Sequence, residues 1–324
     1  MTKTAPPAAA PRGRRAPRAA AGRRGLVVAA LCVLTALVPA FHRLLPNRVA
    51  NLGSLVETFL PWTGAVVLVA AAAGLVRRSR VALIAVLLPA LTWAALYGPG
   101  LADRSAGGPA DLTIVTHNVD DANPDPVGTA RALAASGAQL IALEELVQPS
   151  AGRYEQTLAA THPYHVVEGT VGLWSTFPLR DTAAVPVTSW RVALRATAET
   201  PRGPLTVYVA HLPSVRVRPS GFTTGNRNEG VGRLAAALAG APAGRTLLVG
   251  DFNGTTDDRA LAPVLEHFRS AHEAAGAGFG FSWPARFPFA RIDQILVRDI
   301  TPVSAWTLPA TASDHLPVAA SLRL

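Results

Sequence analysis

Cysteine is nearly absent from this sequence of 324 residues, since it occurs only once, as Cys32. That residue lies in the first long apolar run, and the chain after residue 103 contains no cysteine. A disulfide in this C-terminal part is therefore excluded, and the part must be stable through packing alone. Its length of about 220 residues is enough to bury a core of that kind.

Two common catalytic motifs are also missing. The chain contains neither the G-x-S-x-G pattern of a serine nucleophile nor the P-loop pattern that binds nucleotide phosphates. These absences argue against a serine hydrolase of that type and against a P-loop NTPase.

Negative charge is absent from residues 1–24, which hold seven Lys and Arg residues among many Ala and Pro. Such a segment cannot bury a core, so we predict a disordered basic tail. The net charge of +9 comes from the N-terminal part, because residues 111–324 hold 17 Arg against 19 Asp and Glu. Proteins that wrap duplex DNA usually carry a positive footprint, so nucleic acid is a less expected partner.

Long apolar runs are present three times, at Leu26–Phe41, Thr58–Val76 and Val81–Ala102. A membrane-spanning helix needs about 20 apolar residues, so the second and third runs are long enough. The first run becomes long enough if it extends through Leu44 and Leu45, and a cleaved signal peptide is its alternative interpretation. We therefore predict a membrane anchor of three helices over residues 25–102, in contact with membrane lipids.

The distribution of Lys and Arg between short loops predicts the orientation of this anchor. The tail and the loop RRSR at residues 77–80 are rich in Arg, whereas the loop between the first two runs has only Arg43 and Arg48. The tail and the RRSR loop are therefore expected in the cytoplasm. A linker at residues 103–110 then leads to a domain at residues 111–324, which is expected outside the cytoplasm.

The domain at residues 111–324 repeats one local pattern, in which an apolar, β-branched run carries polar residues at one end. The runs lie within Leu112–Asp120, Ala138–Leu146, Gly203–Leu212, Arg245–Asn253, Arg291–Val297 and Leu316–Arg323. Helical patterns separate them, at 126–136, 228–240 and 257–268. The run at 191–200 is predicted to form an antiparallel hairpin with the run at 203–212. The mixture indicates an α+β fold, with two sheets packed face to face and helices outside.

Strands that share a sheet bring their ends together, so the polar tips are expected to form one cluster of carboxylates, amides and imidazoles. Packed carboxylates repel one another and need a cation or a proton to coexist. A hard divalent ion such as Mg²⁺, or Mn²⁺ as the alternative, binds one or two carboxylates and keeps other positions for water and phosphate. The cluster therefore predicts metal-assisted attack on phosphate.

Six motifs occur in the order THNV, ALEEL, VAHL, GDFN, RIDQIL and SDHLPV. In this order they resemble the endonuclease/exonuclease/phosphatase family, which includes DNase-I-like nucleases, sphingomyelinases and inositol-phosphate phosphatases. The resemblance covers residues 110–324 and implies a four-layer α/β/β/α sandwich. Three apolar runs before such a domain also resemble VanJ-type membrane proteins, which are linked to glycopeptide resistance.

The resemblance implies which residues bind the metal ion. Glu145 is expected to be the principal Mg²⁺ ligand, and Asn118 is expected to position that ligand and to contact the substrate. Asp314 is expected to be a ligand of a second metal site. Glu144 stands where the family usually has Gln, so it either adds negative charge to the site or points elsewhere.

The resemblance also implies which residues carry the chemistry. Asp251 is expected to orient or deprotonate the attacking water, and Asn253 to donate to a phosphate oxygen. His211 is expected to bind phosphate or to assist the leaving group. His315 is expected to hold phosphate or transfer a proton, while Asp293 determines its tautomer and orientation.

Taken singly, each of these residues has an ordinary structural alternative. Asn118 is typical of a turn, Asp251 and Asn253 are typical helix caps, and His211 is a plausible edge histidine. Three arginines after His211 stay open between a solvated role and binding of an anionic head group: Arg216, Arg218 and Arg227.

Three functions are compatible with this sequence. The first is a phosphatase or phosphodiesterase that acts on a membrane-borne, lipid-linked phosphate such as a polyprenyl pyrophosphate. The second is a nuclease outside the cytoplasm, and the third is a catalytically silent binding protein on the same fold. The anchor favours the first function, because tethering raises the effective concentration near lipid head groups.

Overall fold

The computed structural model describes residues 18–189, 192–241 and 243–324, which form two compact units. The first unit comprises residues 63–93 and the described part of residues 1–40, and the second comprises residues 41–62 and 94–324. Residues 1–17 of the predicted basic tail lie outside the described residues. Helix α1 (Arg18–Phe41) begins within that predicted tail, before the apolar run that predicts the helix.

The apolar helices of the chain are α1, α3 (Thr63–Val76) and α4 (Arg80–Leu101). Two stretches of the described residues are long and apolar enough to span a membrane, Leu26–Leu44 and Arg80–Leu101. A third candidate is a bent pair, Leu52–Thr58 with Leu60–Val76, whose two parts meet at 65°. The predicted second span, Thr58–Val76, is interrupted near its start by this bend. Residues 58–62 belong to the second unit, whereas residues 63–76 belong to the first.

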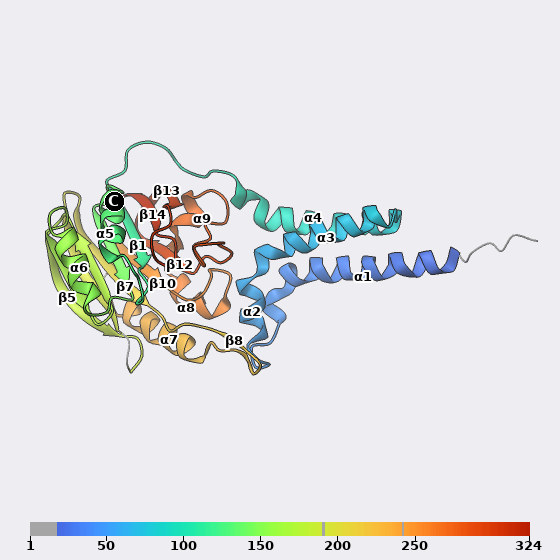
Figure 1. Ribbon diagram of the computed structural model, residues 1–324, viewed down its shortest axis with the longest axis horizontal. Helices are drawn as coiled ribbons and strands as arrows, with labels where there is room; N and C mark the ends of the chain where they lie inside the picture. The colour runs from blue at the N-terminus through green and yellow to red at the C-terminus, as the bar shows by residue number, and fades with distance from the viewer. Residues whose placement is uncertain (1–17, 190–191, 242) are drawn as a thin grey trace, which may run out of the picture. The chain divides into compact units, whose positions relative to one another are not determined.

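Two six-stranded sheets form the centre of the second unit (Figure 1). The first sheet contains β1 (Leu112–Asn118), β2 (Leu140–Glu144), β3 (Tyr164–Glu168), β4 (Val171–Ser175), β13 (Thr301–Thr307) and β14 (Val318–Arg323). The second contains β5 (Leu179–Pro186), β6 (Val192–Thr200), β7 (Gly203–His211), β10 (Thr246–Asp251), β11 (Arg269–Ser270) and β12 (Asp293–Arg298). Their strand orders are β13-β14-β1-β2-β4-β3 and β11-β12-β10-β7-β6-β5. A separate small hairpin pairs β8 (Val217–Arg218) with β9 (Gly221–Phe222).

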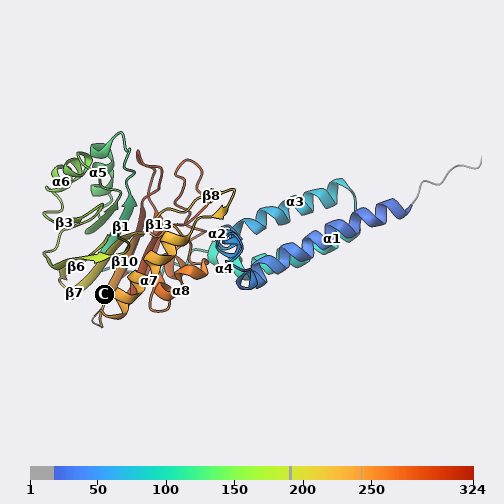
Figure 2. The same ribbon diagram turned by 90° about the horizontal axis from the view of Figure 1, so that it is seen from below.

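Apolar clusters determine how the layers stack. The inner faces of the two sheets pack on each other through residues such as Ile114 and Val207. Helices α5 (Pro126–Ala134) and α6 (Ser150–Leu158) cover the outer face of the first sheet. Helices α7 (Gly225–Ala239) and α8 (Ala262–Leu265) cover the second sheet, on the opposite side of the sandwich (Figure 2). The predicted α+β class, with two packed sheets and helices outside, is confirmed.

The predicted strands are present, and β6 and β7 form the predicted antiparallel hairpin. The last strand begins at Val318, two residues later than the pattern indicates. The helix predicted over 257–268 divides into a short 3-10 turn, η3 (Arg259–Leu261), and α8, with Asp258 as the capping residue of the turn. The helix α9 (Ala271–Ala275) was not predicted, because it is only five residues long. The edge strand β13 was not predicted either, and a bulge between Pro302 and Ser304 interrupts its register.

Residues 41–62, which we call the connecting segment, belong to the second unit and contain η1 (His42–Leu44), α2 (Leu52–Thr58) and η2 (Leu60–Trp62). Arg259 binds this segment through its guanidinium, which donates to Glu57 at 2.6–2.8 Å. The same guanidinium donates at 2.6–2.9 Å to the backbone carbonyls of His42, Arg43 and Leu45. Glu57 is fully buried, so these contacts satisfy a charge that would otherwise be costly inside the protein.

A buried ion pair links the connecting segment to helix α7. Arg227 on α7 donates to Asp258 at 2.6 Å, and both side chains are completely buried. Asp258 also accepts from the Ser54 hydroxyl at 3.0 Å. Arg227 therefore neither faces solvent nor is available for an anionic head group, the two alternatives that the sequence left open for it.

Arg227→Ala is expected to lower the free energy of unfolding by about 3–5 kcal/mol, because it leaves the buried Asp258 carboxylate without its cation. Arg233→Ala on the same helix is the matched control, since Arg233 pairs with Glu229 at the exposed surface. Its expected cost is below about 0.5 kcal/mol. Thermal or denaturant unfolding of both variants in detergent tests this difference, and equal losses would contradict it.

Candidate active site

Both sheets contain a parallel pair of strands, β1 with β2 and β7 with β10. Parallel strands end at the same edge of a sheet, so each pair places its polar tips side by side. In the register, Asp251 is opposite His211 on one side and opposite Asp293 of the antiparallel β12 on the other. Because the two sheets are packed face to face, the tips of β1 and β10 also meet.

An amide joins the two sheets at this edge. Asn118, at the end of β1, donates through Nδ2 to Glu145 Oε1 at 3.0 Å and to Asp251 Oδ2 at 3.1 Å. His211 lies beside the same two carboxylates, with its Nε2 3.5 Å from Glu145 and 3.7 Å from Asp251. Four predicted site residues, contributed by the ends of four strands, are thus brought together.

Glu145 follows β2 directly and has a left-handed backbone, with φ of 61°. A non-glycine residue in this region is strained by the order of 1 kcal/mol, and such strain is concentrated at functional sites. The Glu145 carboxylate accepts from Asp121 N through Oε2 at 3.2 Å. Asp120, Asp121 and Glu145 can present one oxygen each within 4.8 Å of one another.

Asp251 and Asn253 form a tight turn after β10. Asn253 N donates to Asp251 Oδ1 at 2.8 Å, and Asn253 Nδ2 donates to Leu212 O at 3.0 Å. Asn253 also has a left-handed backbone, with φ of 46°. Burial raises the pKa of Asp251 to about 7, although His315 and the hydrogen bonds to the carboxylate oppose this rise.

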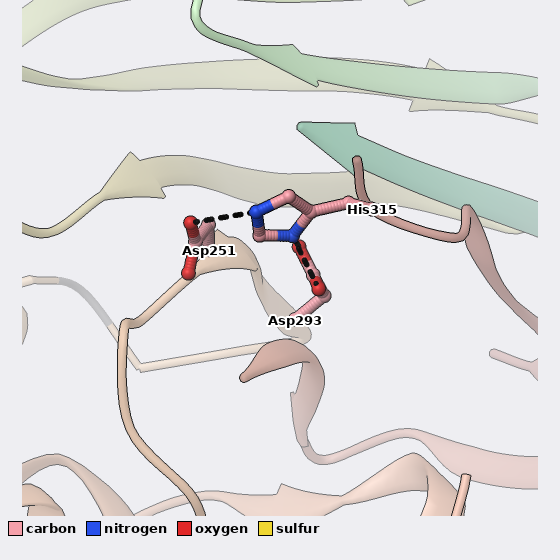
Figure 3. A group of neighbouring side chains, drawn as sticks. All are labelled: Asp251, Asp293 and His315. Atoms are coloured by element: carbon pink, nitrogen blue, oxygen red, sulfur yellow. Dashed lines mark hydrogen bonds and ion pairs between the residues drawn. The ribbon is translucent and has the colours of Figure 1, made fainter. Parts of the chain in front are cut away.

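His315 lies between two carboxylates (Figure 3). Its Nδ1 is 2.9 Å from Asp293 Oδ2, and its Nε2 is 3.9 Å from Asp251 Oδ2. The Ser282 hydroxyl donates to Asp293 at 2.5 Å, which holds that carboxylate in place. Burial alone would lower the pKa of His315, but the carboxylates of Asp293, Asp251 and Asp314 together outweigh burial and raise it to about 10. The imidazole is therefore protonated at neutral pH, with Nε2–H directed toward Asp251.

Asp314 lies apart from Glu145. Its Oδ2 accepts from Trp283 Nε1 at 3.1 Å, and its Oδ1 is 3.9 Å from His315 Nε2. It lines the same cavity as Glu145 but joins neither cluster of possible metal ligands among the described residues. Its predicted role at a second metal site therefore remains a prediction.

Glu144 points away from the cluster and into the protein. Its Oε1 accepts from the Thr116 hydroxyl at 2.7 Å, and its Oε2 has no hydrogen-bond partner among the described residues. Burial raises the pKa of Glu144 well above its usual range. Of the two alternatives left open for Glu144, the structure therefore supports the one in which it points elsewhere.

Several residues of the site were not predicted. Asp120 and Asp121 follow Asn118 directly, and this acidic pair was a signal available in the sequence. Ser313 accepts from His315 N at 3.0 Å and donates to Asn118 O at 2.7 Å, so it connects two predicted residues. No local pattern distinguishes Ser313 from an ordinary turn residue.

The site opens into a cavity of about 540 Å³. One group of lining residues is polar and comes mainly from strand ends: Asp120, Glu145, Asp251, Asn253, Asp314 and His315. A second group is largely apolar and comes from the connecting segment, the β8–β9 region and residues 283–292. Arg216 is the only arginine or lysine among the described lining residues.

The donor set suits a hard divalent cation. Glu145 and Asp251 present carboxylate oxygens on either side of the Asn118 amide, and Asp120 and Asp121 lie beside Glu145. Oxygen ligands of this kind are those that Mg²⁺ prefers.

Comparison with known proteins agrees with this geometry. Residues 115–315 match the sequence profile described as the Endonuclease/Exonuclease/phosphatase family. No curated protein matches the sequence significantly.

Three solved structures illustrate the fold. D. rerio TDP2 complexed with single strand DNA product has a TM-score of 0.56 at 18% identity, over 66% of this chain and 99% of that chain. The mannosyl-6-phosphatase of Bacteroides thetaiotaomicron has a TM-score of 0.54 at 14% identity, over 66% and 100%. A mutant beta toxin from Staphylococcus aureus with bound magnesium ions has 0.52 at 14% identity, over 65% and 99%. At these identities the likeness shows a shared fold alone.

Glu144→Gln is expected to stabilise the protein in EDTA at pH 8 and to leave it nearly unchanged at pH 4.5. The pKa of Glu144 is higher in the folded protein than in the unfolded chain. Below the pKa of the unfolded chain Glu144 costs no stability, but above it the free energy of unfolding falls, because the unfolded chain ionises and the folded protein does not. Gln does not ionise, so the variant avoids this loss of stability. Each gain of about 1 kcal/mol in the free energy of unfolding corresponds to a rise in Tm of about 2–4 °C in a domain of this size. Thermal unfolding at both pH values tests the effect, and a variant that is less stable at pH 8 would contradict a raised pKa of Glu144.

Proposed function

Because the chain belongs to the endonuclease/exonuclease/phosphatase family, we propose that it is a divalent-metal-dependent hydrolase of phosphoric esters or pyrophosphates. The observation that carries this proposal is that the Glu145–Asn118–Asp251 cluster lies beside the Asp293–His315 pair, with Glu145, Asp251 and His315 lining one cavity. A catalytically silent protein would have no evident need for buried, mutually repelling carboxylates at this position.

Glu145, assisted by Asn118, Asp120 and Asp121, would hold the metal ion, with Mn²⁺ as an alternative to Mg²⁺. When bound, such an ion polarises a phosphoryl oxygen and stabilises the charge that develops on the leaving oxygen. Asn118 lies between the Glu145 and Asp251 carboxylates and donates a hydrogen bond to each, which fixes the position of both groups.

Asp251 and His315 carry the proton chemistry in this proposal. Asp251, with a pKa raised to about 7, is suited to accept a proton from the attacking water near neutral pH. His315 is held as a cation by Asp293, so its Nε2–H is suited to bind a phosphoryl oxygen. Asn253 lines the cavity beside Asp251 and would help to orient the phosphoryl group. His211 is buried beside Glu145 and Asp251, at 3.5 and 3.7 Å, and would act on the site through these two carboxylates.

The proposed substrate is a lipid-linked phosphate, and a polyprenyl pyrophosphate is its concrete form. Two helices with the length and composition of membrane spans support a membrane location. If the bent pair is a third span, the Arg distribution favours an orientation with residues 111–324 outside the cytoplasm. The cavity offers apolar residues beside its polar ones, as a substrate with a hydrocarbon tail requires. The slight negative balance of residues 111–324 makes the nuclease alternative weaker, although a TDP2 bound to DNA shares the fold.

Full-length protein in detergent should hydrolyse farnesyl pyrophosphate with Mg²⁺ and should lose this activity in EDTA. Duplex DNA, single-stranded DNA and sphingomyelin are the comparison substrates, and turnover of DNA alone would replace this proposal with the nuclease alternative. Turnover of sphingomyelin alone would indicate a lipid phosphodiesterase, and the absence of all turnover would favour a silent binding protein.

His315→Asn is expected to lower kcat/KM about 10²-fold or more, because Asn can still bond to Asp293 but provides no imidazolium. The substitution keeps the hydrogen bond, so Tm should change little. His267→Ala, at an exposed histidine outside the cavity, is the control and should leave kcat/KM unchanged. Equal rates in the two variants would remove His315 from the mechanism.

Arg216 is expected to bind the second phosphate of a pyrophosphate substrate. Arg216→Ala should raise KM about five- to tenfold for a prenyl pyrophosphate but less than about twofold for the corresponding monophosphate. The effect should weaken at high salt, because Arg216 is exposed. Arg218→Ala, on the same hairpin but not on the cavity wall, is the matched control, and an equal effect in both variants would contradict a specific contact.

A further inference from the structure

One side of the active-site cavity is built by the connecting segment, which precedes the catalytic residues by many positions in the sequence. Thr58 and Phe59 line the cavity together with Glu145, Asp251 and His315. The sequence alone assigns Thr58 and Phe59 to a membrane span, because both lie at the start of a long apolar run. In the structure they belong to the same compact unit as the catalytic residues.

A row of aromatic rings leads from the catalytic histidine to this segment. Trp283 lies against His315 with ring centroids 6.4 Å apart, and Phe289 lies against Trp283 at 5.4 Å. Phe59 follows, with its ring centroid 5.9 Å from that of Phe289. Trp283, Phe289 and Phe59 all line the cavity, so an apolar surface extends outward from the polar end at which phosphate would bind.

The connecting segment is held firmly against the rest of the unit. Its buried Glu57 binds Arg259, and Trp62 Nε1 donates to Phe289 O at 2.9 Å. Asn51 Nδ2 donates to Phe222 O at 2.6 Å, and Phe222 N donates to Ala50 O at 2.9 Å. The two hydrogen bonds to Phe222 also attach the β8–β9 hairpin to the connecting segment, and Val217 and Phe222 of this hairpin line the cavity. This side of the cavity is therefore held in place by hydrogen bonds and an ion pair to the rest of the unit.

Phe59 immediately precedes Leu60–Val76, the longer part of the bent candidate span. A residue at this point of the chain cannot lie far from where that apolar helix begins, since consecutive residues are 3.8 Å apart. The apolar side of the cavity is thus formed by the part of the chain that is covalently next to a candidate membrane helix.

We propose that Phe59 determines specificity, by binding with Phe289 and Trp283 the hydrocarbon chain of a phosphorylated substrate. This inference rests on the proposed function and specifies its substrate class as phosphates that carry an apolar chain longer than a few carbons. A short chain ends near Trp283 and gains nothing from Phe59. A longer chain reaches Phe59 and gains affinity in proportion to the apolar area that it buries.

The test compares two substrates with the same pyrophosphate head, dimethylallyl pyrophosphate with five carbons and farnesyl pyrophosphate with fifteen. In full-length protein, Phe59→Ala should raise KM for farnesyl pyrophosphate about tenfold and should change KM for dimethylallyl pyrophosphate less than about twofold. Phe59→Leu retains an apolar side chain and should restore most of the preference. If Phe59→Ala does not fold, Phe59→Gln preserves the length of the side chain and provides the same comparison.

Phe287→Ala is the matched control. Phe287 belongs to the same aromatic group, with its ring centroid 6.4 Å from that of Trp62, but it is exposed and does not line the cavity. It should leave both KM values unchanged. An equal effect of Phe59→Ala on the two substrates would overturn the role of Phe59 and leave the proposed function standing, whereas failure of the unaltered protein to cleave either pyrophosphate would overturn the proposed function.

Discussion

Repulsion between carboxylates at one edge of the sandwich is the constraint on which the rest of this site depends. Asp251 and Asp293 are neighbours because β10 and β12 pair in one sheet, and the packing of the other sheet against it brings Glu145 to the same edge. The Asn118 amide and the His315 imidazolium offset part of this repulsion. The remaining negative charge makes this edge a favourable position for a divalent cation, which is the ion that the proposed reaction requires.

The turn that carries Asp251 and Asn253 is also tied to the connecting segment. Arg227 donates to Asn253 O at 3.3 Å and to Asp258, which in turn accepts from Ser54. A chain of buried polar contacts therefore runs from a catalytic turn to residues that lie between two candidate membrane helices. The second unit is a joint product of residues 41–62 and 94–324, and residues 111–324 alone lack one side of the cavity.

The local patterns predicted much of the fold, because the periodicity of a strand and the polar residues at its end can both be recognised within a few consecutive residues. The four runs that carry Asn118, Glu145, His211 and Asp251 at their ends became the two parallel pairs, one in each sheet. The pairing of Asp293 with His315 was expected from the resemblance and is present at 2.9 Å. The resemblance distinguished Glu145 from Glu144 but left the direction of the Glu144 side chain open. The structure decides it, because Glu144 accepts from Thr116 whereas Glu145 accepts from Asn118.

By itself, the sequence determined which residues end each strand and which segments are apolar, because both properties depend on neighbours only a few positions apart. Tertiary structure alone decided that Arg227 is buried against Asp258, that Asp314 binds Trp283, and that Phe59 belongs to the catalytic unit. Each of these outcomes joins residues separated by about 30 to more than 200 positions. Contacts over such separations arise from packing of the whole unit, and an apolar run has the same composition whether it is buried in a membrane or against a folded domain.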